Sequence, residues 1–345
     1  MSHERRVLIL AEGYSANDHY GKTGRGVLRY RPEAVVAVLD SERAGETIEG
    51  VPIIGTVAEA LPLHPTTALV GVATTGGRFP PAWRELLKEC IANGLDVESG
   101  LHEFISNDPE LSALAAQHGV ELRDLRKPPA GLNTPTGENL THGAKVVLTV
   151  GSDCAIGKMT VSLELDRAAR ERGIRSEFVP TGQTGIAIAG WGLSIDAVVA
   201  DFLAGATEQL VLEGVSRGGE LLSVEGQGSL LHPAYSGVTL GLLHGSAPHA
   251  LVLCHKAGDT VVDFNELFPI PPLSEVVDLY ERSTLIPRRA RVVAIALNTR
   301  DLGDAAARAA VEEAENETGL PAGDPVRFGV DGIADAVLNA VGLGQ

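Results

Sequence analysis

Cysteine is scarce in this chain of 345 residues, where Cys90, Cys154 and Cys254 lie far apart in the sequence. Disulfide frameworks and structural zinc sites both need cysteines at short, paired spacings, so this pattern argues against both. Unpaired cysteines of this kind are typical of the reducing cytosol. We therefore expect a cytoplasmic protein, and no bound metal.

Long hydrophobic runs and basic clusters are also missing. No apolar segment approaches the roughly 20 residues that span a bilayer, and the N-terminus has no apolar core of a secretory signal. Acidic residues outnumber basic ones by 45 to 28, giving a formal net charge of −17. Such a surface repels nucleic acid and anionic lipid, so we expect neither as a partner. The expected partners are a small molecule and further copies of the chain.

What is present is an α/β composition, 44% hydrophobic and 21% charged. A chain of this length exceeds one hydrophobic core, which favours two domains. Apolar strand-like runs alternate with helical segments in both halves, predicting two parallel sheets. A proline-rich, irregular segment between Asp124 and His142 is the expected linker. We predict a Rossmann-like domain over residues 1–140 and a doubly wound domain like those of P-loop NTPases over residues 141–345.

The strongest motif is VVLTVGSDCAIGKMT, Val146–Thr160. A phosphate-binding P-loop needs glycines that let backbone amides turn inward, a lysine for the outer phosphates and a hydroxyl in the first helical turn. Two departures from the usual pattern are visible: five residues separate the glycines, and Met159 follows the lysine, which puts a magnesium contact in doubt. The residues expected to bind a cofactor are Gly151, Ser152, Asp153, Cys154, Ala155, Ile156, Gly157, Lys158, Met159, Thr160 and, from a later Asn-x-x-Asp sequence, Asn298.

Cys154 lies in this glycine loop, at the N-terminal side of a helix, where amide dipoles are expected to lower the pKa of its thiol. Two roles are open for it. The thiol could be a nucleophile, or the residue could contribute only its backbone N–H.

Candidate catalytic residues follow two later strands. Glu225 ends an apolar run beside glycines, where P-loop proteins place a carboxylate that orients a reacting group, or it could cap the next turn. His232 lies in the next loop and could take a proton from a nucleophile, or be structural. Gln183 lies in PTGQTG, a possible ligand loop or an ordinary turn, and could stabilise an oxyanion. The residues expected to contact the substrate are Thr181, Gly182, Thr184, Arg25, Arg29, Gln227 and Ser229.

The N-terminal half carries weaker signals. Gly21-Lys22-Thr23 resembles part of a P-loop but lacks the upstream glycine, so we interpret it as a solvated basic turn. A second possibility is that it closes over an anionic ligand together with Arg29. Asp40 ends a buried strand, a position that can bind a ribose hydroxyl, although the glycine fingerprint of dinucleotide folds is absent. A glycine pair within residues 73–81 suggests a further ligand loop.

Several of these segments together resemble one family. GSDCAIGKMT, PTGQTG, EGQGSLLHPAYSG and AEGYSANDHYGKTGRGVLRYR are similar to a two-domain family catalogued as a domain of unknown function, whose members are linked to DgcN-type D-glutamate N-acetyltransferases. The resemblance spans essentially the whole chain. It implies a Rossmann-like and a P-loop domain, and transfer of an acetyl group from acetyl-CoA to the amine of D-glutamate in D-amino-acid catabolism.

Two other functions stay open from the residues themselves. The loop is also similar to that of dethiobiotin-synthetase-type enzymes, which suggests an ATP- and Mg²⁺-dependent ligase or kinase acting on a small carboxylate. A third possibility is a nucleotide-binding regulatory module without catalysis.

Overall fold

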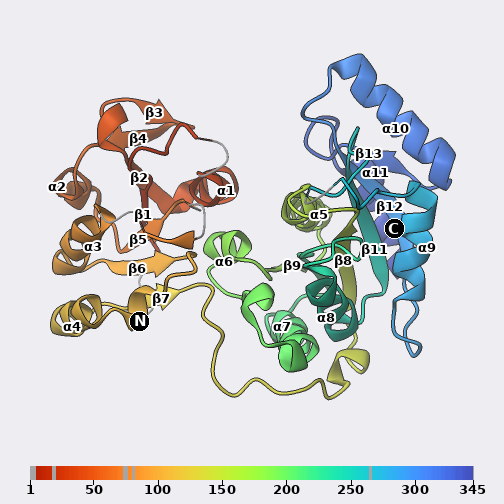
Figure 1. The fold of residues 1–345 in the computed structure, drawn as a ribbon, viewed down its shortest axis with the longest axis horizontal. Helices are drawn as coiled ribbons and strands as arrows, with labels where there is room; N and C mark the ends of the chain where they lie inside the picture. The colour runs from red at the N-terminus through yellow and green to blue at the C-terminus, as the bar shows by residue number, and fades with distance from the viewer. Residues whose placement is uncertain (1–4, 18–20, 73–76, 80–81, 264–265, 345) are drawn as a thin grey trace. The chain divides into compact units, whose positions relative to one another are not determined.

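The computed structural model describes residues 5–17, 21–72, 77–79, 82–263 and 266–344 (Figure 1). The chain divides into two compact units. The first comprises Met1–Pro128 together with Gln183–Ser194, and the second comprises Pro129–Gly182 and Ile195–Gln345. The break after Pro128 falls in the proline-rich segment. The segment Gln183–Ser194 is grouped with the first unit although the chain on both sides of it belongs to the second.

The first unit is built on a seven-stranded sheet in the order β3-β4-β2-β1-β5-β6-β7. Every neighbouring pair is parallel except β3 and β4. The strands are β1 (Val7–Leu10), β2 (Val35–Leu39), β3 (Thr47–Ile48), β4 (Val51–Ile54), β5 (Thr67–Val70), β6 (Asp96–Ser99) and β7 (Leu122–Asp124). The helices are α1 (Lys22–Tyr30), α2 (Val57–Ala60), α3 (Trp83–Ala92), α4 (Pro109–His118) and α6 (Gln183–Ala189).

The predicted Rossmann-like layout is thus confirmed, with one antiparallel edge strand. The central strand β1 is apolar at every position and fully buried, as expected where helices cover both faces of a sheet. Its Leu8 and Leu10 pack in a core with Leu87 and Ile91 of α3. The helix α4 begins at an Asp108 cap and ends at Gly119 in the left-handed conformation, both standard helix boundaries.

One prediction for this unit is wrong. The segment with Gly21-Lys22-Thr23 is not a solvated basic turn, because Lys22–Tyr30 forms α1 and Thr23 is buried. Its Gly24 lies close to the sheet, where a side-chain carbon would come within 2.9 Å of Ile9 Cγ2. The glycine pair proposed as a ligand loop lies mostly outside the described residues, which exclude 73–76 and 80–81.

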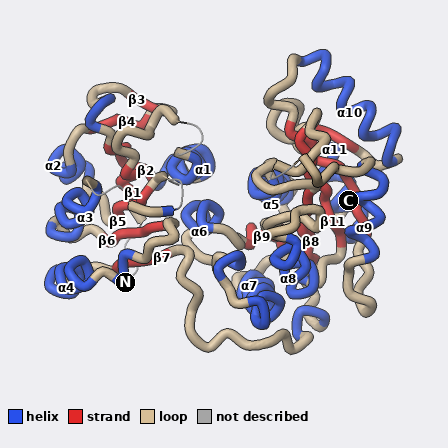
Figure 2. Tube along the Cα trace, viewed as in Figure 1, coloured by secondary structure: helices blue, strands red, loops and turns tan. Residues whose placement is uncertain are grey.

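The second unit contains a six-stranded parallel sheet in the order β13-β12-β11-β8-β10-β9. The strands are β8 (Lys145–Gly151), β9 (Ser176–Val179), β10 (Leu221–Val224), β11 (Ala250–Lys256), β12 (Arg291–Asn298) and β13 (Ala322–Gly323). The helices are α5 (Lys158–Glu171), α7 (Leu203–Ser216), α8 (Ser236–Ser246), α9 (Leu273–Arg282), α10 (Asp304–Thr318) and α11 (Asp331–Val341). Figure 2 shows how strands and helices alternate within each unit.

The order of the strands in this sheet indicates where a ligand would bind. The chain leaves β8 toward β9 and β10 on one side and later returns to β11 on the other, so β8 lies at the switch point of a doubly wound sheet. Ligands in such folds bind outside the carboxyl ends of the strands at this point. In the hydrophobic core of this unit, Val147 of β8, Val252 of β11 and Ala294 of β12 pack with residues of α5 and α11.

Across the described residues, no helix combines the length and apolarity needed to cross a bilayer. All three cysteines are free thiols.

Candidate functional site

The loop between β8 and α5 has the backbone curvature of an anion site. Ala155 and Gly157 take positive φ angles of 54° and 114°, the left-handed region. A side-chain carbon on Gly151 would lie 2.8 Å from Ile156 Cδ1 and 3.2 Å from Lys158 Nζ, so any larger residue there would have to displace these two side chains. Within the described chain, no side chain caps the N-terminus of α5. The first amides of that helix therefore remain available to an anionic ligand.

Lys158 places its charge inside this loop. The side chain is 6% exposed, and Nζ donates to the backbone oxygen of Asp153 at 2.6 Å. Burial lowers the pKa of Lys158, because removing an ammonium group from water disfavours its charged form. An anion in the loop would offset that cost.

Asp153 fixes the shape of the loop. Its carboxylate accepts from the amide of Cys154 at 2.6 Å and from the amide of Asp263 at 2.5 Å. The second bond joins the loop to the segment that follows β11. Ser152 adds a further bond to that strand, since its hydroxyl lies 2.8 Å from His255 Nδ1.

Glu225 is a buried carboxyl at the carboxyl end of β10. Its Oε2 accepts from the amides of Thr181 at 2.9 Å and Gly182 at 3.0 Å. Burial raises the pKa of Glu225 to about 7, although these amides and the side chain of Gln227 act in the opposite direction. The charge of Glu225 also raises the pKa of Lys158, which means that the two groups interact. A carboxyl group that titrates near neutrality can accept or donate a proton under physiological conditions.

Close backbone contacts hold this carboxyl in place. A side-chain carbon on Gly182 would meet Gln227 Nε2 at 2.4 Å and Glu225 Oε1 at 3.2 Å. On Gly226 it would meet the backbone oxygen of Thr149 at 1.8 Å. The amide of Gly226 also donates to Thr149 Oγ1 at 3.0 Å, which joins the end of β10 to β8.

The loop after β10 brings His232 to the P-loop. His232 is buried, and a ring nitrogen lies within 4.8 Å of both a carboxylate oxygen of Asp153 and Cys154 Sγ, as these three atoms do of one another. Ser229 is fully buried, and its hydroxyl accepts from the amide of Leu231 at 3.1 Å. The structure thus gathers residues 151–158, Glu225 and His232 in the second unit.

The expected activation of Cys154 is wrong. Burial raises the pKa of this thiol to about 11, and the nearby positive charge of Lys158 lowers it only in part. The desolvation cost of a thiolate therefore exceeds the benefit of its position near a helix N-terminus.

Four predicted residues lie in the first unit. Gln183 and Thr184 begin α6 and are not in a loop. Gln183 Oε1 accepts from Arg126 Nη1 at 3.2 Å, and the hydroxyl of Thr184 lies 3.0 Å from that of Thr23. Arg25 and Arg29 belong to α1, where the guanidinium of Arg29 lies 5.4 Å from the ring centre of Tyr30.

Asn298 contacts the P-loop directly. Its Nδ2 donates to the backbone oxygen of Ile156 at 3.3 Å, so the end of β12 supports the loop. Met159 occupies the first turn of α5, where a P-loop usually carries a hydroxyl, and Thr160 follows it. The replacement removes the side chain that normally binds magnesium.

Tyr280 is a supporting residue that sequence reasoning missed. It is fully buried on α9; its hydroxyl donates to the oxygen of Gly151 at 2.7 Å and accepts from the amide of Leu230 at 3.1 Å. The phenol thus joins the start of the P-loop to the loop that carries His232. It lies 129 residues from Gly151 in sequence, and a tyrosine on the buried side of an amphipathic helix carries no local signal of such a role.

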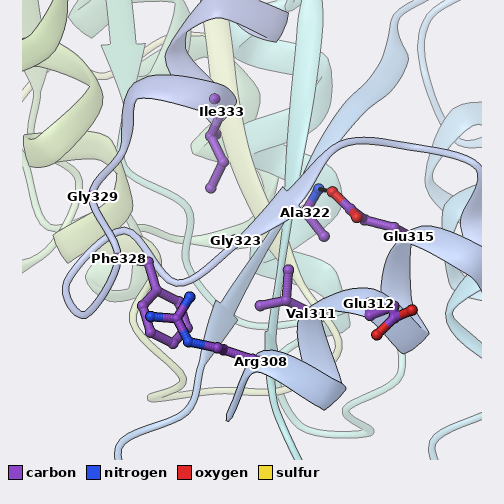
Figure 3. A pocket seen from close by; sticks show the side chains of 10 residues that line it. Arg308, Val311, Glu312, Glu315, Ala322, Gly323, Phe328, Gly329 and Ile333 are labelled. Atoms are coloured by element: carbon purple, nitrogen blue, oxygen red, sulfur yellow. Dashed lines mark hydrogen bonds between the residues drawn. The ribbon is translucent and has the colours of Figure 1, made fainter. Parts of the chain in front are cut away.

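A cavity of about 360 Å³ lies elsewhere in the second unit, between α10, β13 and α11 (Figure 3). The guanidinium of Arg308 stacks over the ring of Phe328 at 4.6 Å, and Glu315 accepts from the amide of Ala322 at 3.2 Å. Arg308 and Glu315 thus have partners from the protein itself. These contacts identify no ligand.

Comparison with known proteins gives consistent matches. Residues 133–334 match a family model described as a domain of unknown function, DUF1611, C-terminal P-loop domain, and residues 41–128 match its N-terminal Rossmann-like domain. A protein of Tritonibacter scottomollicae named D-glutamate N-acetyltransferase is 37% identical over 92% of this chain and 93% of its own. One of the same name from a Pseudoalteromonas species is 38% identical over 80% and 82%. The crystal structure of a DUF1611 family protein from Anabaena variabilis is 44% identical, covers 97% of this chain and 99% of its own, and superposes with a TM-score of 0.87.

Proposed function

The chain belongs to the DUF1611 family, and from this we propose that it is an N-acetyltransferase which moves the acetyl group of acetyl-CoA to the amine of D-glutamate. Two relatives with that name, similar over most of their length, support the proposal. The observation that carries it is Glu225, a carboxyl with a pKa of about 7 whose charge interacts with the P-loop lysine. We further propose a cytoplasmic homo-oligomer that acts in D-amino-acid catabolism.

Glu225 supplies the base that acyl transfer requires. An amino acid carries a protonated amine at neutral pH, and only the free amine attacks a thioester. In this mechanism Glu225 accepts the ammonium proton, the amine nitrogen bonds to the thioester carbonyl carbon, and the bond from that carbon to the CoA sulfur breaks. The nitrogen then loses its second proton to the departing thiolate, which leaves as the free thiol of CoA. A base with a pKa near the working pH is well matched to this task.

The P-loop offers groups that suit the phosphates of coenzyme A. Its uncapped amides and Lys158 would hold a diphosphate without phosphoryl transfer. Asn298 stabilises the loop through its hydrogen bond to the backbone oxygen of Ile156. For the dicarboxylate acceptor we propose, within the second unit, Lys158 as a cationic partner and Thr181, Gly182, Gln227 and Ser229 as polar contacts.

An ATP-dependent ligase or kinase is the alternative. The same loop can hold ATP, but Met159 cannot supply the hydroxyl that a P-loop offers to magnesium. This replacement favours coenzyme A over Mg²⁺-ATP as the ligand.

A paired assay tests the proposal. Purified protein is incubated with acetyl-CoA and a panel of D- and L-amino acids while free thiol is measured, and in parallel with ATP, Mg²⁺ and the same acids while phosphate is measured. We expect thiol release that depends on D-glutamate and is lost in Glu225→Gln. Carboxylate-dependent phosphate release would replace the proposal with the ligase. Nucleotide binding without either product would indicate a regulatory module.

A further inference from the structure

The main chain holds the carboxylate of Glu225 through one oxygen, Oε2. This oxygen accepts from the amides of Thr181 at 2.9 Å and Gly182 at 3.0 Å. A carboxylate oxygen has two lone pairs in its plane, so these two bonds occupy Oε2. A proton taken up by Glu225 therefore goes to Oε1, and the groups around Oε1 decide how readily the carboxyl accepts it.

The side chain of Gln227 lies beside Oε1. It donates a hydrogen bond to Glu225, which favours the charged form of the carboxyl. A side-chain carbon on Gly182 would meet both Gln227 Nε2 and Glu225 Oε1, so these two atoms border the same small space. Because Oε2 is occupied by the two main-chain amides, the bond from Gln227 falls on Oε1.

Thr181 fixes which end of the Gln227 amide faces the carboxyl. The hydroxyl of Thr181 lies 2.6 Å from the backbone oxygen of Glu225, and a carbonyl oxygen only accepts, so the hydroxyl donates its single proton there. Toward Gln227 the hydroxyl can therefore only accept, from Nε2 at 3.3 Å. The NH₂ group has two N–H donors, one for Thr181 and one for Glu225. The reversed amide would place its oxygen against two oxygens that have no proton to give.

Two charged groups act on the same carboxyl. Asp196, in the turn Ile195–Ala197, raises the pKa of Glu225 through its negative charge. The ammonium group of Lys158 on α5 interacts with Glu225 and has the opposite sign. Burial and Asp196 thus favour the neutral carboxyl, whereas the main-chain amides, Gln227 and Lys158 favour the carboxylate.

We propose that Gln227 positions Glu225 for proton transfer, because its Nε2–H group holds Oε1, the oxygen that receives the proton of the acceptor amine. This inference rests on the proposed function for the identity of that amine. Oε1 has two lone pairs, so one accepts from Gln227 while the other takes the proton. A donor to the charged form keeps part of the buried carboxyl ionised at neutral pH, which a base requires. The contact of Gln227 with the acceptor then falls to its side-chain oxygen.

Two substitutions of Gln227 separate positioning from packing. Gln227→Met keeps the length of the side chain and removes both N–H groups, so the pKa of Glu225 should rise by about one unit from its value near 7. Gln227→Glu keeps the shape but places a second carboxyl beside the first, which should raise the pKa of Glu225 further. A packing role predicts the reverse order, because Glu is closer to Gln in shape than Met is.

The pH profile of kcat/KM measures this shift in the reaction. A lost contact with the acceptor lowers the profile equally at every pH, whereas a higher pKa moves its midpoint. In Gln227→Met the loss relative to the wild type should be about fivefold larger at pH 7 than at pH 9.

Thr239→Val is the matched control for the loop. It removes the hydroxyl that donates to the backbone oxygen of Gln227 at 2.9 Å and keeps the side-chain amide. The midpoint of its pH profile should equal that of the wild type. A loss in Gln227→Met that is the same at every pH, or an equal shift in Thr239→Val, would overturn the proposal.

A measurement without substrate keeps this test apart from that of the proposed function. ¹³C NMR of protein labelled at the Glu side-chain carboxyls reports the pKa of Glu225, whose signal is assigned by its loss in Glu225→Gln. If the wild type transfers no acetyl group, the proposed function fails, while the titration still shows whether Gln227 sets this pKa. The same pKa of Glu225 in the wild type, Gln227→Met and Gln227→Glu would rule out the positioning role, whether or not the protein is active.

Discussion

Two buried carboxyls at strand ends, Asp40 after β2 and Glu225 after β10, look alike in sequence but differ in how the backbone holds them. Asp40 uses both oxygens: Oδ1 accepts from the amides of Gly13 and Glu42, and Oδ2 from the amide of Ser15. Glu225 takes both of its main-chain amide bonds on Oε2, and its further hydrogen bond comes from the side chain of Gln227. The main chain therefore holds both oxygens of Asp40 but only one oxygen of Glu225.

The largest expected effect is that of Glu225→Gln, which tests the proposed role of this carboxyl as the base. Glu225→Gln keeps the shape of the side chain and an oxygen for the Thr181 and Gly182 amides, but it cannot accept a proton. We expect turnover to fall by about 10²–10⁴-fold, with CoA affinity nearly unchanged. In the wild type kcat/KM should rise with pH through about 7, as Glu225 loses its proton. Unchanged turnover in the variant would remove this residue from the mechanism.

The same carboxyl should make stability depend on pH. Burial raises its pKa from the ordinary 4.5 to about 7, so between these values the folded protein keeps a proton that the unfolded chain has lost. Unfolding then releases a proton, and the free energy of unfolding falls as the pH rises through this window, by about 3 kcal/mol in total. Urea denaturation at pH 4.5 and pH 8 measures this. The difference between the two pH values should shrink by that amount in Glu225→Gln, and an equal difference in both proteins would contradict the assigned pKa.

The sequence predicted the P-loop well because its signals are local. A continuous apolar strand, a glycine loop and a helix are encoded in fifteen neighbouring residues, and the structure places them at Lys145–Glu171 as β8 and α5. The position of Glu225 followed from the same logic, since strand ends in parallel sheets share one edge.

Helices that depend on distant contacts were missed. The helix α8 contains three glycines, which disfavour a helix locally. In the structure two of them let α7 approach: a side-chain carbon on Gly241 would lie 2.6 Å from Leu203 Cβ, and one on Gly245 would lie 2.2 Å from the oxygen of Ala204. In the same way Gly26 of α1 makes room for Thr184 of α6. Such pairs become visible only when both partners are placed in space.

Asp40→Asn tests whether Asp40 serves to hold the backbone in place. The variant places an NH₂ group where one carboxylate oxygen accepts a main-chain amide, leaving a buried donor facing a donor. We expect the free energy of unfolding to fall by about 2–3 kcal/mol. Turnover per folded molecule should not change, which reverses the pattern expected for Glu225→Gln. Chemical denaturation and kinetics on the same samples measure both, and a loss of turnover without a loss of stability would assign Asp40 to a ligand site.

The smallest expected effect is that of removing the positive charge of Lys158. Lys158→Ala removes a charge-assisted contact to the bound diphosphate worth about 1.5–3 kcal/mol, so the Kd for CoA should rise roughly 10- to 150-fold. Because Lys158 and Glu225 interact, losing the positive charge should also move the midpoint of the pH–rate profile above 7. Isothermal titration and the pH profile of kcat/KM measure the two consequences, and Asp40→Asn is the matched control that should change neither. A Kd for CoA equal to that of the wild type would show that Lys158 holds the loop closed through the oxygen of Asp153 and takes no part in binding the diphosphate.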